Sequence, residues 1–116
     1  MGKTIKVEKL WEIQPAILSD ETMSSKRIIS KKRDDSDRMS LHHVVIKNRA
    51  GWKDVAPYET QDEIIYVLDG KMKISWDGQE VELTPGCCAY IPAGSPYKTL
   101  VPDEVTLICA FSPPAE

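Results

Sequence analysis

The sequence of 116 residues lacks any apolar run that approaches the roughly 20 residues needed to cross a membrane. Residues 1–10 are charged and alternating, without the continuous apolar stretch of a secretion signal. Cysteine is scarce and odd in number, with only Cys87, Cys88 and Cys109 present, and two adjacent cysteines are poorly placed for a disulfide. We therefore expect a cytoplasmic protein with reduced thiols, neither secreted nor inserted in a membrane.

The sequence also lacks a surplus of positive charge. Its formal net charge is -3, and the basic run within residues 26–33 is followed at once by an acidic run within residues 34–37 that largely cancels it. No basic field is available to collect phosphates, so nucleic acid is not expected as a partner. The 41% of hydrophobic and 28% of charged residues are ordinary for a folded chain, and this length corresponds to about one domain.

The sequence also lacks the pattern of an amphipathic helix, because no window of useful length has apolar residues at helical spacing. Apolar residues instead alternate with polar ones in short runs bounded by Gly, Pro or acidic residues, which predicts a nearly all-β protein. The expected strands cover residues 26–31, 39–47, 64–68, 71–84 as a hairpin, 88–91 and 104–111. Residues 5–17 fit either an edge strand or a short helix. We expect a polar loop over residues 19–25 and a tail over residues 112–116 that cannot extend a central strand.

The hairpin over residues 71–84 is the clearest unit. Asp77-Gly78 supplies the two residues with positive φ that a type I′ turn demands, and the turn fixes the register of both strands. The resulting pairs are Trp76 with Gln79, Ile74 with Val81 and Met72 with Leu83 on one face, and Lys73 with Glu82 on the other. Every large apolar side chain of the two strands therefore falls on one face.

Two spaced patterns resemble the signatures of the cupin family. The first signature is Gly, five residues, His, one residue, His, three or four residues, Glu, six residues, Gly; the second is Gly, five residues, Pro, one residue, Gly, two residues, His. The matching positions are Gly51, Pro57, Glu59, Glu63 and Gly70, then Gly86, Pro92, Gly94 and Tyr97. The four glycines, Pro92 and Glu63 keep the family residue, whereas the three histidines are replaced.

The resemblance implies an all-β cupin fold, an antiparallel jelly-roll barrel also described as a double-stranded β-helix. The chain would then be a single cupin domain over residues 1–116. We expect an N-terminal arm and loop over residues 1–25, the barrel over residues 26–111 and a tail over residues 112–116. Barrels of this family often pair, so we also expect a homodimer joined through an edge strand.

The replaced histidines bear on the metal, which in cupins is normally held by three imidazoles and one carboxylate. This chain offers Pro57, Glu59, Glu63 and Tyr97 instead, and an oxygen-only set binds transition metals more weakly than imidazole does. Our main expectation is no cofactor or a weakly held divalent metal. In the alternative, Glu59, Glu63 and Tyr97 hold Fe, Mn or Mg, with His42 as an extra ligand.

Within the cupins, the chain resembles the ectoine synthases, which close a ring by eliminating water. The shared elements are Arg27 in Arg-Ile-Ile-Ser-Lys-Lys, the Ser-Leu-His run ending at His42, Tyr58, Tyr66 and the C-terminal Ile-Cys-Ala-Phe-Ser-Pro-Pro. This resemblance implies active-site roles for Arg27 and Tyr58 and a metal role for Glu63, but the family's metal-binding histidine is Tyr97 here. Residues 62–95 are also similar to the cupin domain of ethanolamine-utilisation proteins, which likewise lack the histidines.

Carboxylates and histidines near the signatures are candidates for proton transfer. Two carboxylates that share a barrel mouth raise the pKa of one of them, which creates an acid or base near neutrality. By alternation Glu59 and Glu63 share a side while Asp62 points elsewhere, so the first two are preferred. His42 and His43 point to opposite faces of a strand. Alternation leaves open which of them faces the barrel, and the resemblance favours His42.

The aromatic residues and Arg27 are candidates for contact with substrate. Phenol groups in a cavity can donate hydrogen bonds to a developing oxyanion, and Tyr58 and Tyr97 are assigned that role, although most tyrosines of a small barrel are core or rim residues. Arg27 can hold an anionic group by a bidentate contact, or can be a solvated surface residue. The candidate substrate-binding residues are Arg27, Tyr66, Trp76 and Phe111.

The leading hypothesis is an atypical cupin enzyme, a lyase or isomerase, that acts on a small polar metabolite by dehydration, isomerisation or ring closure. Glu63 and His42 would move protons, and Tyr58 and Tyr97 would stabilise an oxyanion; oxygenase chemistry, which needs a firmly held redox metal, is less expected. The alternative is a non-catalytic cupin that binds a small molecule or a partner. An enzyme should keep a polar, open cavity, whereas a remnant site should be filled by Met72, Ile74, Trp76 and Phe111.

Overall fold

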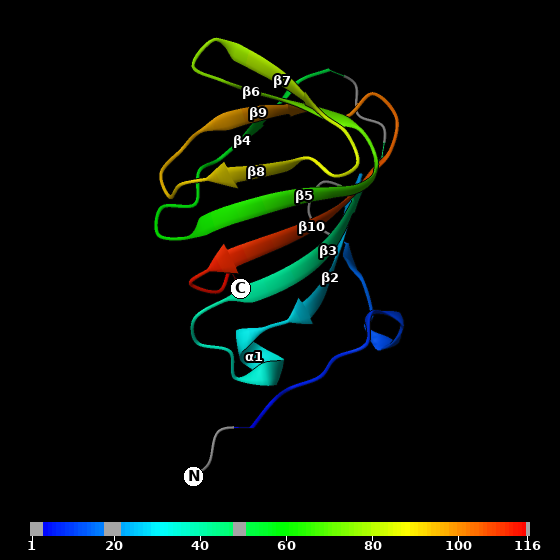
Figure 1. The fold of residues 1–116 in the computed structure, drawn as a ribbon, viewed down its shortest axis with the longest axis vertical. Helices are drawn as coiled ribbons and strands as arrows, with labels where there is room; N and C mark the ends of the chain where they lie inside the picture. Colours follow the sequence, from blue (N-terminus) through cyan, green and yellow to red (C-terminus); the bar gives the residue numbers. More distant parts are fainter. Residues whose placement is uncertain (1–3, 18–21, 48–50, 116) are drawn as a thin grey trace.

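The computed structural model describes residues 4–17, 22–47 and 51–115, which fold into two antiparallel β-sheets (Figure 1). The larger sheet has the order β1-β2-β3-β10-β5-β8 and the smaller one β4-β9-β6-β7. The strands of the larger sheet are β1 Ala16–Ile17, β2 Met23–Ile29, β3 Ser40–Ile46, β5 Asp62–Gly70, β8 Cys88–Ile91 and β10 Val105–Ser112. Those of the smaller sheet are β4 Lys53–Val55, β6 Met72–Trp76, β7 Gln79–Leu83 and β9 Tyr97–Leu100. The helices are short, η1 at Leu10–Glu12 and α1 at Lys31–Asp34.

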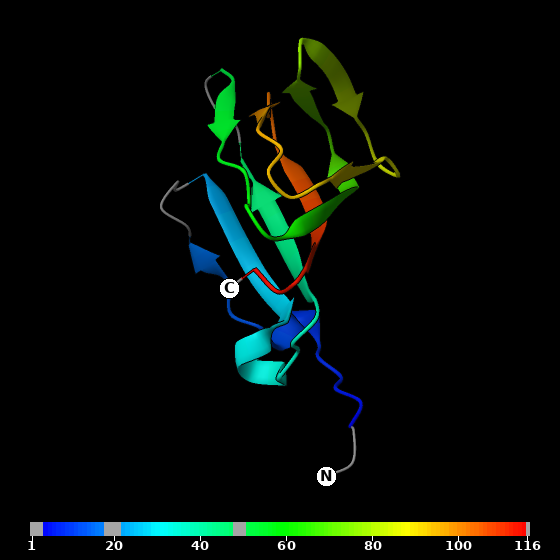
Figure 2. The ribbon, with the colours of Figure 1, turned by 90° about the vertical axis from the view of Figure 1, so that its left-hand side faces the viewer.

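The two sheets curve around a common interior, which Figure 2 shows from the side. Alternation along the strands sends one set of side chains into this interior, as in β3 and β10, where buried residues alternate with partly exposed ones. The core consists of Val44, Ile46, Ile65, Val67, Met72, Ile74, Leu83, Ile91, Val101, Val105, Leu107, Cys109 and Phe111. The antiparallel, nearly all-β fold predicted from the sequence is confirmed.

The β6–β7 hairpin has the register that its turn predicts. Asp77 and Gly78 both have positive φ, at 48° and 73°, and the observed partners are those deduced from the sequence. Met72, Ile74 and Leu83 on its inner face are buried. Local turn chemistry and the apolar pattern therefore agree about this unit, and the prediction is confirmed.

The first long strand, β2, lies closer to the N-terminus than the sequence predicted. The sequence placed it at residues 26–31, whereas β2 begins at Met23 and ends at Ile29. It ends there because Ser30 caps α1: its side chain accepts a hydrogen bond from the Arg33 amide at 3.1 Å, and its own amide donates to Asp34 Oδ2 at 2.9 Å. The expected polar loop over residues 19–25 was therefore wrong at its C-terminal end, and residues 18–21 lie outside the described residues.

Three elements were not predicted. The strands β4 and β9 are only three and four residues long, and α1 lies within the charged stretch where alternation carries no signal. Residues 5–17, for which the sequence allowed an edge strand or a short helix, contain both: the short helix η1 is followed by the strand β1. Because β1 and the start of β2 pair before residue 26, the expected boundary between arm and barrel falls inside the larger sheet.

Gly70 lies where β5 gives way to β6 and has a φ of +75°. A Cβ at this position would overlap the carbonyl oxygen of Glu104, so the close approach of the two backbones requires glycine. This approach fixes the end of β5 against the start of β10. Among the residues that the structure describes, no helix has the length and apolar character of a membrane span.

Candidate functional site

A small chamber lies between the two sheets, with a volume of about 140 Å³. Apolar core residues, including Met72 and Leu107, form much of its wall. Its polar lining consists of Ser25, His42, Tyr58, Glu63, Tyr97, Thr99 and Cys109. We call this cavity the inner chamber. It brings together all four residues predicted to be catalytic, which come from β3, β5, β9 and the loop before β5.

Glu63 is the ionisable centre of the inner chamber. Its side chain is buried, with 5% relative exposure, and burial raises the pKa of its carboxyl from 4.5 to about 7. The Tyr97 hydroxyl donates to Glu63 Oε1 at 3.3 Å, and the Cys109 thiol bonds the same carboxyl, and both bonds favour the ionised form. Burial and the Glu63 charge raise the pKa of Tyr97 and of Cys109, so both keep their protons near neutrality.

Strand register explains why these side chains meet. Residues directly opposite each other on antiparallel strands have side chains on the same face. Phe111 lies opposite Glu63, and Cys109 lies opposite His42, which in turn lies opposite Arg27 on β2. His42 therefore faces the interior and is buried. The choice between His42 and its neighbour, which alternation left open, is settled in favour of His42.

Two aromatic contacts line one end of the inner chamber. The Phe111 ring lies 5.1 Å from the His42 ring and 4.9 Å from the Tyr58 ring, centroid to centroid, with the Tyr58 ring edge-on. Tyr58 is half exposed, and its pKa is raised by partial burial and by the Glu63 charge, while the Arg27 charge acts in the opposite direction. Arg27 is exposed and within electrostatic reach of Tyr58, but it does not line the inner chamber.

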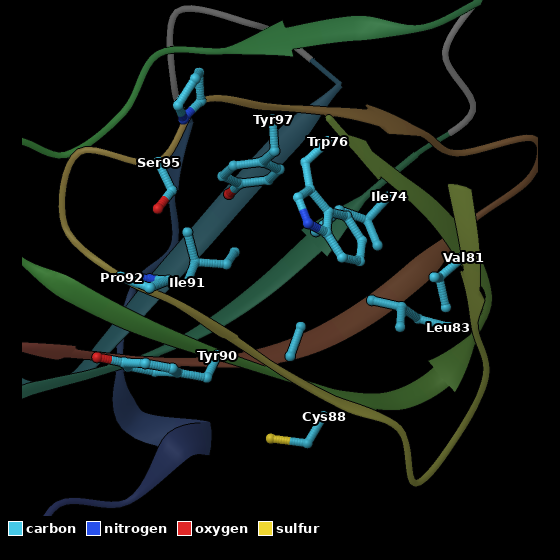
Figure 3. Close-up of a pocket in the computed structure, with 12 residues that line it drawn as sticks. Ile74, Trp76, Val81, Leu83, Cys88, Tyr90, Ile91, Pro92, Ser95 and Tyr97 are labelled. Carbon is cyan, nitrogen blue, oxygen red and sulfur yellow. The ribbon is translucent and has the colours of Figure 1, made fainter. Parts of the chain in front are cut away.

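A wider groove lies beside the inner chamber, with a volume of about 410 Å³ (Figure 3). It runs between the β6–β7 hairpin and β8, and Trp76, Tyr90 and Ile91 are among the side chains that line it. Tyr97 lines both this groove and the inner chamber. The phenol ring of Tyr97 therefore forms a common wall between a polar cavity and a largely apolar one.

Some predicted site residues are not brought to the inner chamber. Glu59 is exposed and lines neither cavity. Tyr66 is also exposed, on the outer face of β5, because it lies three residues from Glu63 and so on the opposite side of the strand. Asp62 points away as alternation predicted, and its carboxylate accepts a hydrogen bond from the Ala93 amide at 2.9 Å.

The expected metal ligands do not fit a metal ion. Of the oxygen donors Glu59, Glu63 and Tyr97, the first is outside the chamber, and the other two are hydrogen-bonded to each other. Within residues 4–17, 22–47 and 51–115, no group of three or more His, Cys, Asp and Glu side chains is arranged to hold one. We therefore derive no step of the chemistry through a metal.

The sequence analysis missed three chamber residues, Cys109, Ser25 and Thr99. Cys109 could have been found, because it alternates in phase with the buried positions of β10. Ser25 was placed in a loop, and Thr99 belongs to a strand that the analysis did not predict. Ser25 Oγ is buried and has no hydrogen-bond partner among the described residues, so it is available to a molecule in the chamber.

Comparison with known proteins finds one family model and several similar structures. The family model described as cupin domain matches residues 46–111. The fold is similar to KdgF from Halomonas sp., with a TM-score of 0.79 and 17% identity, over 95% of this chain and 96% of that chain. It is also similar to ectoine synthase from P. lautus, with a TM-score of 0.80 and 24% identity, over 96% and 80% of the two chains.

A further similar structure is the EutQ protein of Clostridium difficile, with a TM-score of 0.67 and 28% identity. That match covers 79% of this chain and 63% of the EutQ chain. No curated protein matches the chain in sequence. The likeness to these structures supports the cupin fold and leaves the chemistry to be argued from the inner chamber itself.

Proposed function

The chain belongs to the cupin family, and we propose that it is an enzyme that acts on a small metabolite by acid/base chemistry in the inner chamber. The observation that carries the proposal is Glu63, a buried carboxyl whose pKa of about 7 lets it both take and return a proton at neutral pH. Tyr97 and Tyr58 are hydroxyl donors beside it. The reaction class is dehydration, isomerisation or ring closure, as in lyases and isomerases.

The proposed step begins when ionised Glu63 takes the proton from a carbon next to a substrate carbonyl. The electron pair of the broken C–H bond forms a C=C bond, and the negative charge moves to the carbonyl oxygen. Tyr97, which no longer faces a carboxylate, donates its hydrogen bond to that oxygen, and Tyr58 can supply a second one. In a dehydration the C=O bond then re-forms, the electron pair makes a C=C bond to the β-carbon as the C–O bond of the β-hydroxyl breaks, and Glu63 gives its proton to that hydroxyl, which leaves as water. In an isomerisation of a substrate with a C=C bond between its β- and γ-carbons, the C=O bond re-forms, the C=C bond moves next to it, and Glu63 returns the proton to the γ-carbon.

The sizes of the two cavities indicate how the substrate lies. At about 140 Å³ the inner chamber is smaller than the roughly 300–1,000 Å³ of typical ligand pockets, so it holds only the reacting end. The adjoining groove of about 410 Å³ falls in that range and shares the Tyr97 wall. We therefore assign the polar, reacting end to the chamber and an apolar remainder to the groove, against Trp76.

The test is a panel of small hydroxy- and keto-carboxylates incubated in D₂O and followed by proton NMR. We expect exchange or loss of the proton next to the carbonyl for at least one compound, and a rate lower by about 10²–10⁴ in Glu63→Gln. Glu82→Gln makes the same chemical change at an exposed position of β7. It is the matched control and should keep the wild-type rate. Turnover that survives unchanged in Glu63→Gln would refute the proposal.

A second candidate function is a non-catalytic cupin that binds a small molecule. It is favoured by the buried packing of Met72 and Phe111, two of the residues expected to fill a remnant site, and by the small size of the inner chamber. In that case the ligand would occupy the groove alone. Compounds of the panel would then raise the melting temperature of wild type and Glu63→Gln equally, with no exchange in either.

A further inference from the structure

Ser25 is a polar residue in an apolar part of the wall of the inner chamber. It lies on β2 opposite Val44, which in turn lies opposite Leu107 on β10. The next pair along these strands, Met23 with Ile46, also lines the chamber and is apolar. An inward position of a strand with such neighbours normally carries an apolar side chain, so the hydroxyl of Ser25 needs a reason.

The hydroxyl of Ser25 is unpaired, in contrast to those of the two other serines that are buried in the described part of the chain. Ser30 Oγ accepts a hydrogen bond from the Arg33 amide at 3.1 Å. Ser40 Oγ accepts one from the Ala115 amide, also at 3.1 Å. Ser25 is only 4% exposed, yet its Oγ has no partner among the described residues. A buried hydroxyl without a partner costs stability, and a molecule in the chamber that bonds to it removes that cost.

The lining of the inner chamber indicates that the group bonded to Ser25 is uncharged. Among the described residues that form this lining there is no Lys or Arg, and Glu63 is acidic. A carboxylate beside Ser25 would be buried without a counter-ion and would be repelled by Glu63 once that residue ionises. A neutral hydroxyl suits the position, because it can donate to Ser25 Oγ or accept from it. Any carboxylate of the substrate therefore stays outside the chamber.

Strand register sets the separation between this group and the reacting carbon. Glu63 lies opposite Phe111 on β10, whereas Ser25 shares a row with Leu107, four residues earlier on the same strand. Four residues of a strand cover about 13 Å. A hydrogen-bond contact of about 3 Å at each end leaves about 7 Å for the ligand. An extended chain of about five bonds spans that length.

We infer that Ser25 is a specificity-determining residue whose hydroxyl bonds to a neutral hydroxyl of the substrate, about five bonds from the carbon that Glu63 deprotonates. The inference rests on the proposed function, because the same chamber takes the reacting end of the substrate. It narrows the substrate class to hydroxy-ketones and hydroxy-aldehydes whose polar end carries no charge.

Three methyl ketones with the same number of carbon atoms test the inference. Methyl propyl ketone, acetopropyl alcohol and levulinate end in a methyl group, a hydroxyl and a carboxylate, respectively. NMR titration of the ¹⁵N-labelled wild-type chain gives their dissociation constants. We expect acetopropyl alcohol to bind about tenfold or more tightly than either of the others, because a site built to bond a hydroxyl rejects analogues without one. The inference would be overturned if acetopropyl alcohol failed to bind or bound no tighter than methyl propyl ketone, or if levulinate bound most tightly.

Ser25→Ala should weaken the binding of acetopropyl alcohol by about tenfold and leave that of methyl propyl ketone unchanged. Ser24→Ala is the matched control. It makes the same change one residue earlier on β2, where alternation turns the side chain to the outer face, and it should alter neither constant. A Ser25→Ala chain that still prefers acetopropyl alcohol as strongly as wild type would contradict the role of Ser25.

Urea unfolding without ligand tests whether the hydroxyl is unpaired. Ser25→Ala should unfold at the same urea concentration as wild type or at a higher one, because it removes a buried group that lacks a bond. Ser40→Ala should unfold at a lower concentration, because it leaves the Ala115 amide without its acceptor. If both variants were destabilised alike, Ser25 would be bonded within its own chain, and the inference would be wrong.

The titrations measure binding and not turnover, so their failure can be told apart from failure of the proposed function. Proton exchange in D₂O without a preference for acetopropyl alcohol would remove only the role of Ser25. A preference for acetopropyl alcohol that depends on Ser25, with no exchange for any compound, would instead refute the acid/base chemistry and keep the binding site.

Discussion

The two faces of the larger sheet carry opposite kinds of side chain on the same strands. On β5, Glu63 is buried inside while Ile64 is exposed outside, and on β3 the buried His42 is followed by the outward His43. In both faces burial disfavours the charged form: it raises the pKa of Glu63 and lowers that of His43. The inner face thus buries an ionisable group at a cost in stability, and the outer face leaves apolar side chains partly exposed.

The largest expected effect is the loss of stability when a leucine is shortened on the inner face rather than on the outer face. Leu107→Ala on the inner face of β10 should lower the free energy of unfolding by about 2–5 kcal/mol, because it leaves a cavity in the core. Leu68→Ala, at an exposed outer position of β5, should cost under about 1 kcal/mol in the monomer. Urea unfolding at low protein concentration measures both. Equal losses would show that the outer face is covered within one chain.

The second effect is the pH dependence of stability. Below pH 4.5 Glu63 is protonated in folded and unfolded chains; between pH 4.5 and about 7 only the unfolded chain ionises, so the free energy of unfolding falls as pH rises. The loss should total about 3 kcal/mol and level off above pH 7. Glu63→Gln should remove this slope. Urea unfolding at several pH values checks it, and an identical slope in the variant would contradict Glu63 as the source of the pH dependence.

A smaller effect concerns the hydrogen bond from Tyr97. Because this bond favours ionised Glu63, Tyr97→Phe should raise the pKa of Glu63 above its value of about 7, at a cost of about 1 kcal/mol to the ionised form. A ¹³C NMR titration of the Glu63 carboxyl reports the change. Tyr66→Phe, which alters a phenol on the outer face, should leave that titration unchanged. A fall in the pKa of Glu63 would show that the bond from Tyr97 favours the protonated carboxyl instead.

The smallest effect lies on the outer face. Lys26→Gln removes the charge that helps to hold the pKa of His43 down, so this pKa should rise, while desolvation keeps it below 6.5. Since the folded pKa is depressed, His43 costs stability as pH falls below 6.5, and the variant should lose less stability in acid. Proton NMR of the imidazole follows the titration. An unchanged pKa would leave burial as the sole cause.

Much of the fold could be predicted because its signals are local. Asp77-Gly78 fixes a turn, and alternation then fixes every pair of the hairpin. Alternation could not choose between His42 and His43, because apolar residues of this strand share a side with each of the two histidines. The inward direction is set by β10, which pairs His42 with Cys109 from more than sixty residues later. That information exists only in the assembled sheet.

The candidate site was predictable in part, for a related reason. Glu63 and Tyr97 stand at positions marked by the cupin signatures, and the structure brings them to 3.3 Å. Glu59 stands at such a position too, yet it falls before β5 begins and stays in solvent. The groove beside Tyr97 has no signature, because it is made from strands whose packing no short pattern encodes.

The strand order of the larger sheet sets a condition on the timing of synthesis. Of the strands in the described residues, β10 leaves the ribosome after all the others, yet it lies between β3 and β5 and pairs with both. Until residues 105–112 emerge, those two strands each present an open edge that can pair with another chain. The hairpin of β6 and β7 can close early, but the wall that carries Cys109 and Phe111 is added last. Pausing of translation before residue 105 would therefore hold the nascent chain in its most aggregation-prone form.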